Sequence, residues 1–137
     1  MARKVMEKTR QIALTLVIAG ILAPGFGQAP GRQPLSLALA CVGKDCPLLK
    51  GVPQTAGMRS GYVRLKPGQS VGWHSTGHNE ECLIILHGAG KALIEGRRAL
   101  EFAAPHAVYI PPATKHNVTD TGGDVLEYVY VVAPAAE

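Results

Sequence analysis

From Gly61 onward the chain consists of short apolar runs separated by turn residues. The runs are four to seven residues long, rich in Val, Ile, Leu and Tyr, and bounded by Gly or Pro: GYVRL, ECLIIL, KALIE, AVYI and LEYVYVV. Strand-length runs at this spacing are typical of an all-β sandwich or barrel. No stretch after residue 30 has the length and period of an amphipathic helix. We therefore predict an all-β fold.

The charge of the chain is concentrated at its N-terminus. The formal net charge is +4, and the first ten residues supply +3 of it through four basic residues and one glutamate. The rest of the chain, with 10 basic and 9 acidic residues, is close to neutral. No basic stripe with interleaved aromatic residues is present, so nucleic acid is not an expected partner.

Residues 1–29 have the features of a signal peptide. A basic stretch precedes the twelve-residue apolar run IALTLVIAGILA, which is followed by Pro24 and Gly25. A membrane span needs roughly 20 apolar residues, so the shorter run suits an export signal, with Gly27 and Ala29 near a cleavage site. We expect a periplasmic or secreted protein; an uncleaved segment that anchors the chain to the membrane is the alternative. Residues 30–59 form a Pro/Gly-rich lead-in.

Export bears on the cysteines. Cys41 and Cys46 lie in the loop-like stretch CVGKDC, with four residues between them. In an oxidising compartment they could form a small-loop disulfide; two unpaired thiols are the alternative. Cys82 is left over and is expected to be a small buried residue of a strand.

The stretch GWHSTGHNEECLIILHG, residues 72–88, combines two histidines with paired glutamates. Imidazole and carboxylate groups together bind divalent transition metals well. On an extended chain, residues four apart point the same way, so His74 and His78 could share a face unless Gly77 bends the chain. Glu80 or Glu81 could complete such a site.

A second polar stretch, YIPPATKHNVTDTG, covers residues 109–122. The expected strand AVYI ends at Pro111 and Pro112, which fix the backbone before a short loop delivers His116 and Asn117. A rigid loop suits a group that must be held in place. Asn117 is either a partner that orients a ligand or a turn residue.

Together the two stretches resemble the motifs of the cupin superfamily, which has an RmlC-like jelly-roll barrel. The first motif has the form G-x5-H-x-H-x3-4-E-x6-G, and the second G-x5-P-x-G-x2-H-x3-N. The matching positions are Gly68, His74, Glu81 and Gly88, followed by Pro111, Ala113, His116 and Asp120. The resemblance implies a single cupin jelly-roll β-barrel over residues 60–133. The subgroup it resembles has a WHST…EE stretch and is sometimes labelled mannose-6-phosphate isomerase-like.

The resemblance implies a metal inside the barrel, held by three histidines and a glutamate. Carried over to this sequence, the ligands are His74, Glu81 and His116, while Thr76 stands where the family has a second histidine. A hydroxyl is a poor replacement for imidazole. We expect His78 to take over that role, with a water at that position, or loss of the metal, as the alternatives. Glu80 is the alternative to Glu81.

The resemblance implies a divalent transition metal (Mn, Fe, Zn or Ni) and a small-molecule ligand or substrate. Chemistry of the dioxygenase or isomerase type would follow. The alternative is a non-catalytic small-ligand-binding or structural cupin with a degenerate metal site. A homodimer is also expected, because small cupins often pair and exposed sheet edges need cover. Arg64 could anchor an anionic substrate, or point outward into solvent. The aromatic residues Trp73, Tyr62, Tyr109, Tyr128 and Tyr130 are expected to pack in the core.

Overall fold

The computed structural model describes residues 32–136, and within this range the chain forms β-strands without a helix. The predicted all-β fold is confirmed. The expected signal peptide, residues 1–29, lies outside the described residues. Between residues 32 and 136 there is no helix long and apolar enough to cross a membrane. The strands are β1 (Asp45–Lys50), β2 (Arg59–Leu65), β3 (Asn79–His87), β4 (Ala89–Ile94), β5 (Leu100–Ala103), β6 (His106–Ile110), β7 (His116–Asp120) and β8 (Leu126–Pro134).

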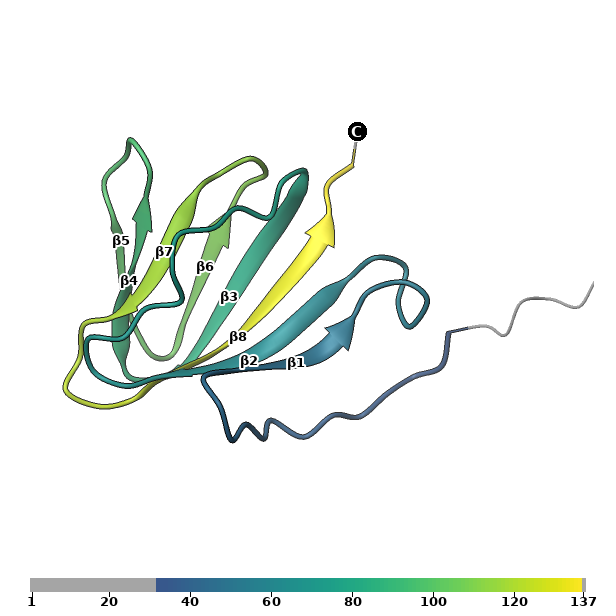
Figure 1. Ribbon diagram of the computed structural model, residues 1–137, viewed down its shortest axis with the longest axis horizontal. Helices are drawn as coiled ribbons and strands as arrows, with labels where there is room; N and C mark the ends of the chain where they lie inside the picture. The colour runs from purple at the N-terminus through teal and green to yellow at the C-terminus, as the bar shows by residue number, and fades with distance from the viewer. Residues whose placement is uncertain (1–31, 137) are drawn as a thin grey trace, which may run out of the picture. The chain divides into compact units, whose positions relative to one another are not determined.

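The strands form two antiparallel sheets (Figure 1). The larger sheet has the order β1-β2-β8-β3-β6 and the smaller one the order β5-β4-β7. From β3 to β8 the chain passes repeatedly from one sheet to the other, so that strands distant in sequence become neighbours. This winding brings β2, β3 and β7, which carry most of the polar residues singled out above, toward a common interior.

The register of the larger sheet arranges its inward side chains in rows. One row runs across β2, β8, β3 and β6 as Arg59, Val132, Glu81 and Ile110. Side chains of a strand alternate between the two faces of the sheet, and the remaining inward positions are almost all apolar. Together with residues of the smaller sheet they form the core: Val63, Leu65, Leu83, Ile85, Ala92, Phe102, Val108, Ile110, Val118, Leu126 and Tyr128.

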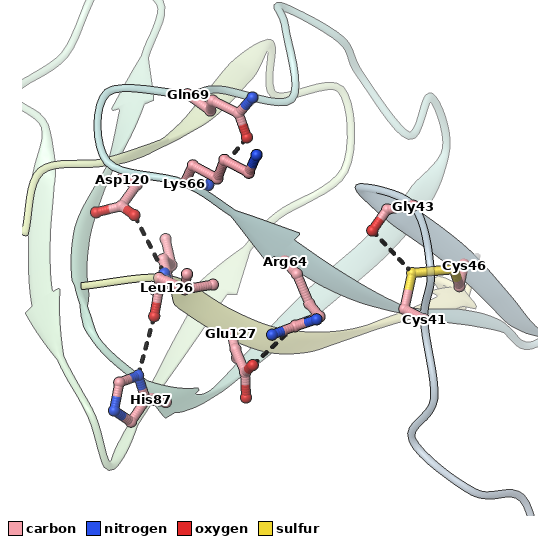
Figure 2. Close-up of polar contacts among 11 residues, drawn as sticks. Cys41, Gly43, Cys46, Arg64, Lys66, Gln69, His87, Asp120, Leu126 and Glu127 are labelled. Carbon is pink, nitrogen blue, oxygen red and sulfur yellow. Dashed lines mark hydrogen bonds and ion pairs between the residues drawn. A yellow bond between two sulfur atoms is a disulfide. The ribbon is translucent and has the colours of Figure 1, made fainter.

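Three strands lie where the sequence showed no strand pattern. β1 falls inside the lead-in. Its sequence DCPLLK shows no strand pattern, because it is short and contains a proline. β1 forms an edge of the larger sheet, where a proline is tolerated, and a disulfide joins its Cys46 to Cys41, which precedes the strand (Figure 2). β5 and β7 are four and five residues long, too short to show a clear alternation.

Cys82 is free and half-buried, since its side chain faces away from the core.

The loop between β2 and β3 behaves as an additional, partial strand beside β7. The amide of Val71 donates to the carbonyl of Val118 (3.1 Å), and an isolated bridge pairs Ser70 with Thr119. Val71 also packs against the core. The loop that leads to His74 is therefore fixed along most of its length.

A buried carboxylate organises the turn between β7 and β8. Asp120 is 1% exposed, and its two side-chain oxygens accept hydrogen bonds from two different amides. The amide of Gly122 donates to Oδ1 (2.8 Å) and the amide of Leu126 donates to Oδ2 (3.1 Å). Figure 2 shows the second of these bonds reaching the start of β8. The cupin motif has asparagine at the position of Asp120. Here both side-chain oxygens of Asp120 act as acceptors, and an asparagine would offer one.

Replacing Asp120 with Asn should destabilise the fold by about 1–3 kcal/mol, because an amide leaves one buried N–H donor unpaired. Urea unfolding would measure the change in free energy of unfolding. Asp124→Asn is the matched control, since Asp124 is exposed in the same turn, and its effect should stay within about 0.5 kcal/mol. Equal stability of the Asp120→Asn variant and the unchanged protein would show that the second bond contributes nothing.

Candidate metal centre

His74 and His116 face each other across a short antiparallel pair. The amide of each donates to the carbonyl of the other, at 3.0 and 2.9 Å. Directly opposed residues in an antiparallel pair place their side chains on the same face. The two imidazole rings accordingly lie with their centroids 4.3 Å apart.

A backbone carbonyl orients each ring. Nδ1 of His74 lies 2.9 Å from the carbonyl oxygen of Gly72, and Nδ1 of His116 lies 3.0 Å from that of Thr114. Since a carbonyl only accepts, each Nδ1 carries the proton, and each neutral ring presents a bare lone pair at Nε2. A ring held in this way by a hydrogen bond at its other nitrogen is the usual arrangement of a metal-ligating histidine.

Strand alternation decides between the two glutamates. Glu81 stands in an inward row of β3 and is 4% exposed. Glu80 faces the outer side of the sheet, where its Oε2 accepts a hydrogen bond from the Tyr109 hydroxyl (3.1 Å). Only Glu81 can reach the two histidines.

The three side chains converge on one point. One potential ligand atom from each of His74, Glu81 and His116 lies within 4.8 Å of the others. Oε2 of Glu81 and Nε2 of His116 are 3.2 Å apart and buried, and neither has a hydrogen-bond partner. With Nδ1 protonated, these are two electron-pair donors facing each other, and a proton or a metal ion between them would satisfy both.

A proton can fill this role when no metal is bound. Burial lowers the pKa of the His116 imidazole, but the adjacent Glu81 carboxylate and the hydrogen bond to the Thr114 carbonyl raise it by more. The resulting pKa lies above the ordinary value for histidine. A divalent transition metal held at the same place would accept a lone pair from each of the three side chains.

Thr76 and His78 do not join this group. The hydroxyl of Thr76 donates to the carbonyl of Asn79 (2.8 Å), and the Asn79 side-chain amide donates back to the Thr76 carbonyl (2.8 Å). Gly77, with a φ of 64°, completes the turn, and its carbonyl accepts from the amide of Ala113 (2.6 Å). The turn directs His78 into solvent. This geometry therefore does not support the expectation that His78 replaces the missing histidine.

A cavity of about 260 Å³ opens beside His74 and Glu81. Its walls include the apolar Val71 and Val132 and the polar Thr76. Its other lining residues are Arg59, His74, Ser75, Glu81 and Tyr130. His74 is the exposed member of the candidate metal group and lines the cavity together with Glu81, whereas His116 is fully buried.

Asn117 supports the site from β7. It is buried, and its side-chain oxygen accepts a hydrogen bond from the amide of Gly72 (3.0 Å). Gly72 is also the residue whose carbonyl orients His74. Asn117 thus holds the segment that presents His74, which is one of the two roles considered from the sequence.

The other polar and aromatic candidates lie apart from the cavity, except Tyr130. Arg64 points outward and pairs with Glu127 (2.9 Å; Figure 2). Tyr62 and Tyr128 are buried as expected, whereas Trp73 and Tyr109 are exposed. The sequence analysis missed Arg59, because a basic residue at a strand start has no distinguishing signal until the register places it on the inner face.

Comparison with known proteins identifies the fold. A profile described as "Cupin domain" matches residues 61–132, more than half of the chain. No curated protein matches significantly. The predicted jelly roll is confirmed by many similar solved structures, among them a cupin protein from Bacteroides fragilis, with 23% identity and a TM-score of 0.61. That match covers 80% of this chain and 89% of the other.

Two further structures are similar over shorter stretches. The cupin domain of Schizosaccharomyces pombe Cnp3 is 16% identical, with a TM-score of 0.59, and 66% of this chain is covered. A Thermotoga maritima protein described as a predicted oxalate decarboxylase is 26% identical, with a TM-score of 0.52 and 56% of this chain covered. The chain spans 64% and 66% of these two proteins, slightly less than two thirds of each.

Exchanging single histidines tests which of them bind metal. His74→Ala and His116→Ala should each weaken Zn²⁺ binding by at least about 100-fold, since even residues that merely orient a ligand contribute about 10- to 100-fold. His78→Ala is the matched control and should leave the affinity unchanged. Calorimetric titration would measure the affinities. A large loss of affinity in His78→Ala would mean that the turn rearranges and that His78 is a ligand.

Proposed function

The chain belongs to the cupin domain family, and on this premise we propose that it binds a divalent transition metal and acts on a small molecule. His74, Glu81 and His116 would hold the metal, and the adjoining cavity would receive the ligand. The observation that carries the proposal is the unsatisfied buried pair, Oε2 of Glu81 and Nε2 of His116.

The set of side chains indicates the kind of site. Two histidines and one carboxylate with open positions are the ligand set of non-haem Fe(II) oxygenases. When bound, the metal would supply Lewis acidity and free coordination positions for an oxygen atom of a ligand. Thr76 is hydrogen-bonded within its turn and His78 is exposed, so neither side chain competes for those positions.

The cavity walls favour oxygenase chemistry over isomerase chemistry. An isomerase that moves a proton between neighbouring carbons needs a general base. Once His74 and Glu81 are committed to the metal, the lining residues include no other imidazole or carboxylate. An oxygenase places less demand on such a base. One similar structure is described as a predicted oxalate decarboxylase, so cleavage of a small dicarboxylate belongs among the reactions to assay.

A non-catalytic cupin that merely binds a small ligand is the second candidate. Three ligands are one fewer than the resembling motif implies, and Thr76 contributes no lone pair because its hydroxyl is engaged. The two candidates share the cavity and differ in whether the metal turns over a substrate.

We also propose that the protein is exported. The disulfide between Cys41 and Cys46 supports this, because disulfides persist mainly in oxidising compartments. The apolar run of residues 12–23 would serve as the core of the signal. Cell fractionation, with mass spectrometry of the mature N-terminus, would test it; an intact N-terminus on a reduced cytoplasmic protein would contradict it.

A homodimer is our proposal for the assembly. The outer face of the larger sheet exposes Ile84, Leu86 and Tyr109, each at least 40% accessible. A face with such residues is a common place for association between protein chains. Light scattering at several concentrations would test this, and a monomer throughout would contradict it.

Natively expressed protein is expected to carry about one transition metal per chain, and Glu81→Gln to lose it, because the amide is a weaker ligand than a carboxylate. Added metal should raise the stability of the apoprotein by about 2.7 kcal/mol when the free ion reaches 100 times its Kd. Elemental analysis and thermal melting measure both quantities. No bound metal, together with no change in melting on adding Mn, Fe, Zn or Ni, would reject the proposal.

Oxygen consumption separates the enzyme from the binding protein. The Fe(II)-loaded protein should consume O2 with at least one member of a panel of small organic acids, and Glu81→Gln should not. Carbon dioxide release from oxalate is measured in parallel. Metal binding without turnover of any member would favour the non-catalytic candidate.

A further inference from the structure

Arg59 stands opposite the candidate metal centre on the inner face of the larger sheet. It begins β2, and the register aligns it with Val132 on β8 and Glu81 on β3. Because neighbouring strands are about 4.8 Å apart, Arg59 and Glu81 start from points roughly 10 Å apart with the cavity above them. Both line that cavity.

The guanidinium of Arg59 has no partner among residues 32–136. It forms no ion pair and no side-chain hydrogen bond there. Arg64, on the same strand but on the opposite face, is paired with Glu127. An arginine that is left unpaired beside a cavity can offer its planar fork to a carboxylate.

Tyr130 stands next to Arg59 on the same side of the cavity. Its Cα partner across the sheet is Gly61, two residues along β2 from Arg59. A Cβ at position 61 would lie 2.6 Å from the Tyr130 ring and hydroxyl, so the ring lies flat over the glycine. The hydroxyl is therefore above β2, close to the start of the strand where Arg59 lies.

The Tyr130 hydroxyl is available as a donor. It makes no hydrogen bond within the described part of the chain. Burial, together with the negative charges of Asp45 and Glu81, raises the pKa of this hydroxyl. It thus remains protonated at neutral pH and can donate to an anion.

We propose that Arg59 and Tyr130 anchor the carboxylate of a small organic acid, whose other end reaches the metal side of the cavity at His74. This inference rests on the proposed function and names its substrate class. Among the described residues that line the cavity, Arg59 is the one Lys or Arg side chain and Glu81 the one carboxylate, so a bound divalent ion would leave the cavity with a net positive charge, which favours an anionic ligand. The cavity of about 260 Å³ is below the range usual for drug-sized ligands, which limits the acid to a few carbons.

Malonate binding to the metal-loaded protein tests the proposal. Calorimetry should show that Arg59→Gln weakens malonate about 10- to 100-fold, as expected for hydrogen bonds to a charged group. Tyr130→Phe should weaken it several-fold. Arg64→Gln is the matched control and should bind like the unchanged protein. Neutral malonamide should bind at least 10-fold more weakly than malonate, and inorganic phosphate should not compete effectively.

Metal content and melting are measured on every variant. Arg59 is exposed, so its variants should fold and retain metal. Equal malonate affinity in Arg59→Gln, an equal loss in Arg64→Gln, or tighter binding of phosphate than of malonate would overturn the proposal. Full metal content without malonate binding would overturn it and leave the metal function standing. If the unchanged protein takes up no metal, the proposed metal function is rejected. Malonate binding to the apoprotein that is weakened in Arg59→Gln would then still support the anchor. No malonate binding to the apoprotein would reject the anchor as well.

Discussion

The reciprocal backbone hydrogen bonds between His74 and His116 are the constraint on which the site depends. They join a loop that leaves the larger sheet to a strand of the smaller one, and they set both imidazole rings on one side of that junction. Glu81 then has only to point inward from β3 for three ligand atoms to meet. The geometry of the centre is thus fixed mainly by the backbone, and the side chains need few torsions to reach it.

Much of the fold could be predicted from the sequence, because alternation and turn residues are local signals. The same alternation separates the inward Glu81 from the outward Glu80, once the strand is known to begin at Asn79. Three things could not be predicted. β1 is hidden by its proline, β7 is too short to show a period, and Arg59 gains its meaning only from a register formed with a strand about 70 residues away.

Thr76 illustrates why a motif position is not equivalent to a ligand. Its departure from the family pattern suggested that His78 would take over the role of the missing histidine, unless Gly77 bends the chain. In the structure Gly77 does bend it: its left-handed conformation and its hydrogen bond to Ala113 close a tight turn. The threonine hydroxyl completes the turn. A residue that would be a weak metal ligand is thereby structurally useful, and a metal held by His74, Glu81 and His116 would keep an open side.

The contact between Gly61 and Tyr130 has a consequence for how this cavity could change during evolution. The ring occupies space that any side chain at position 61 would fill. A side chain at position 61 would force the Tyr130 ring to move and would change the shape of the cavity that this ring lines, without altering any polar group. Residue 61 does not line the cavity, yet through Tyr130 it limits the space available there.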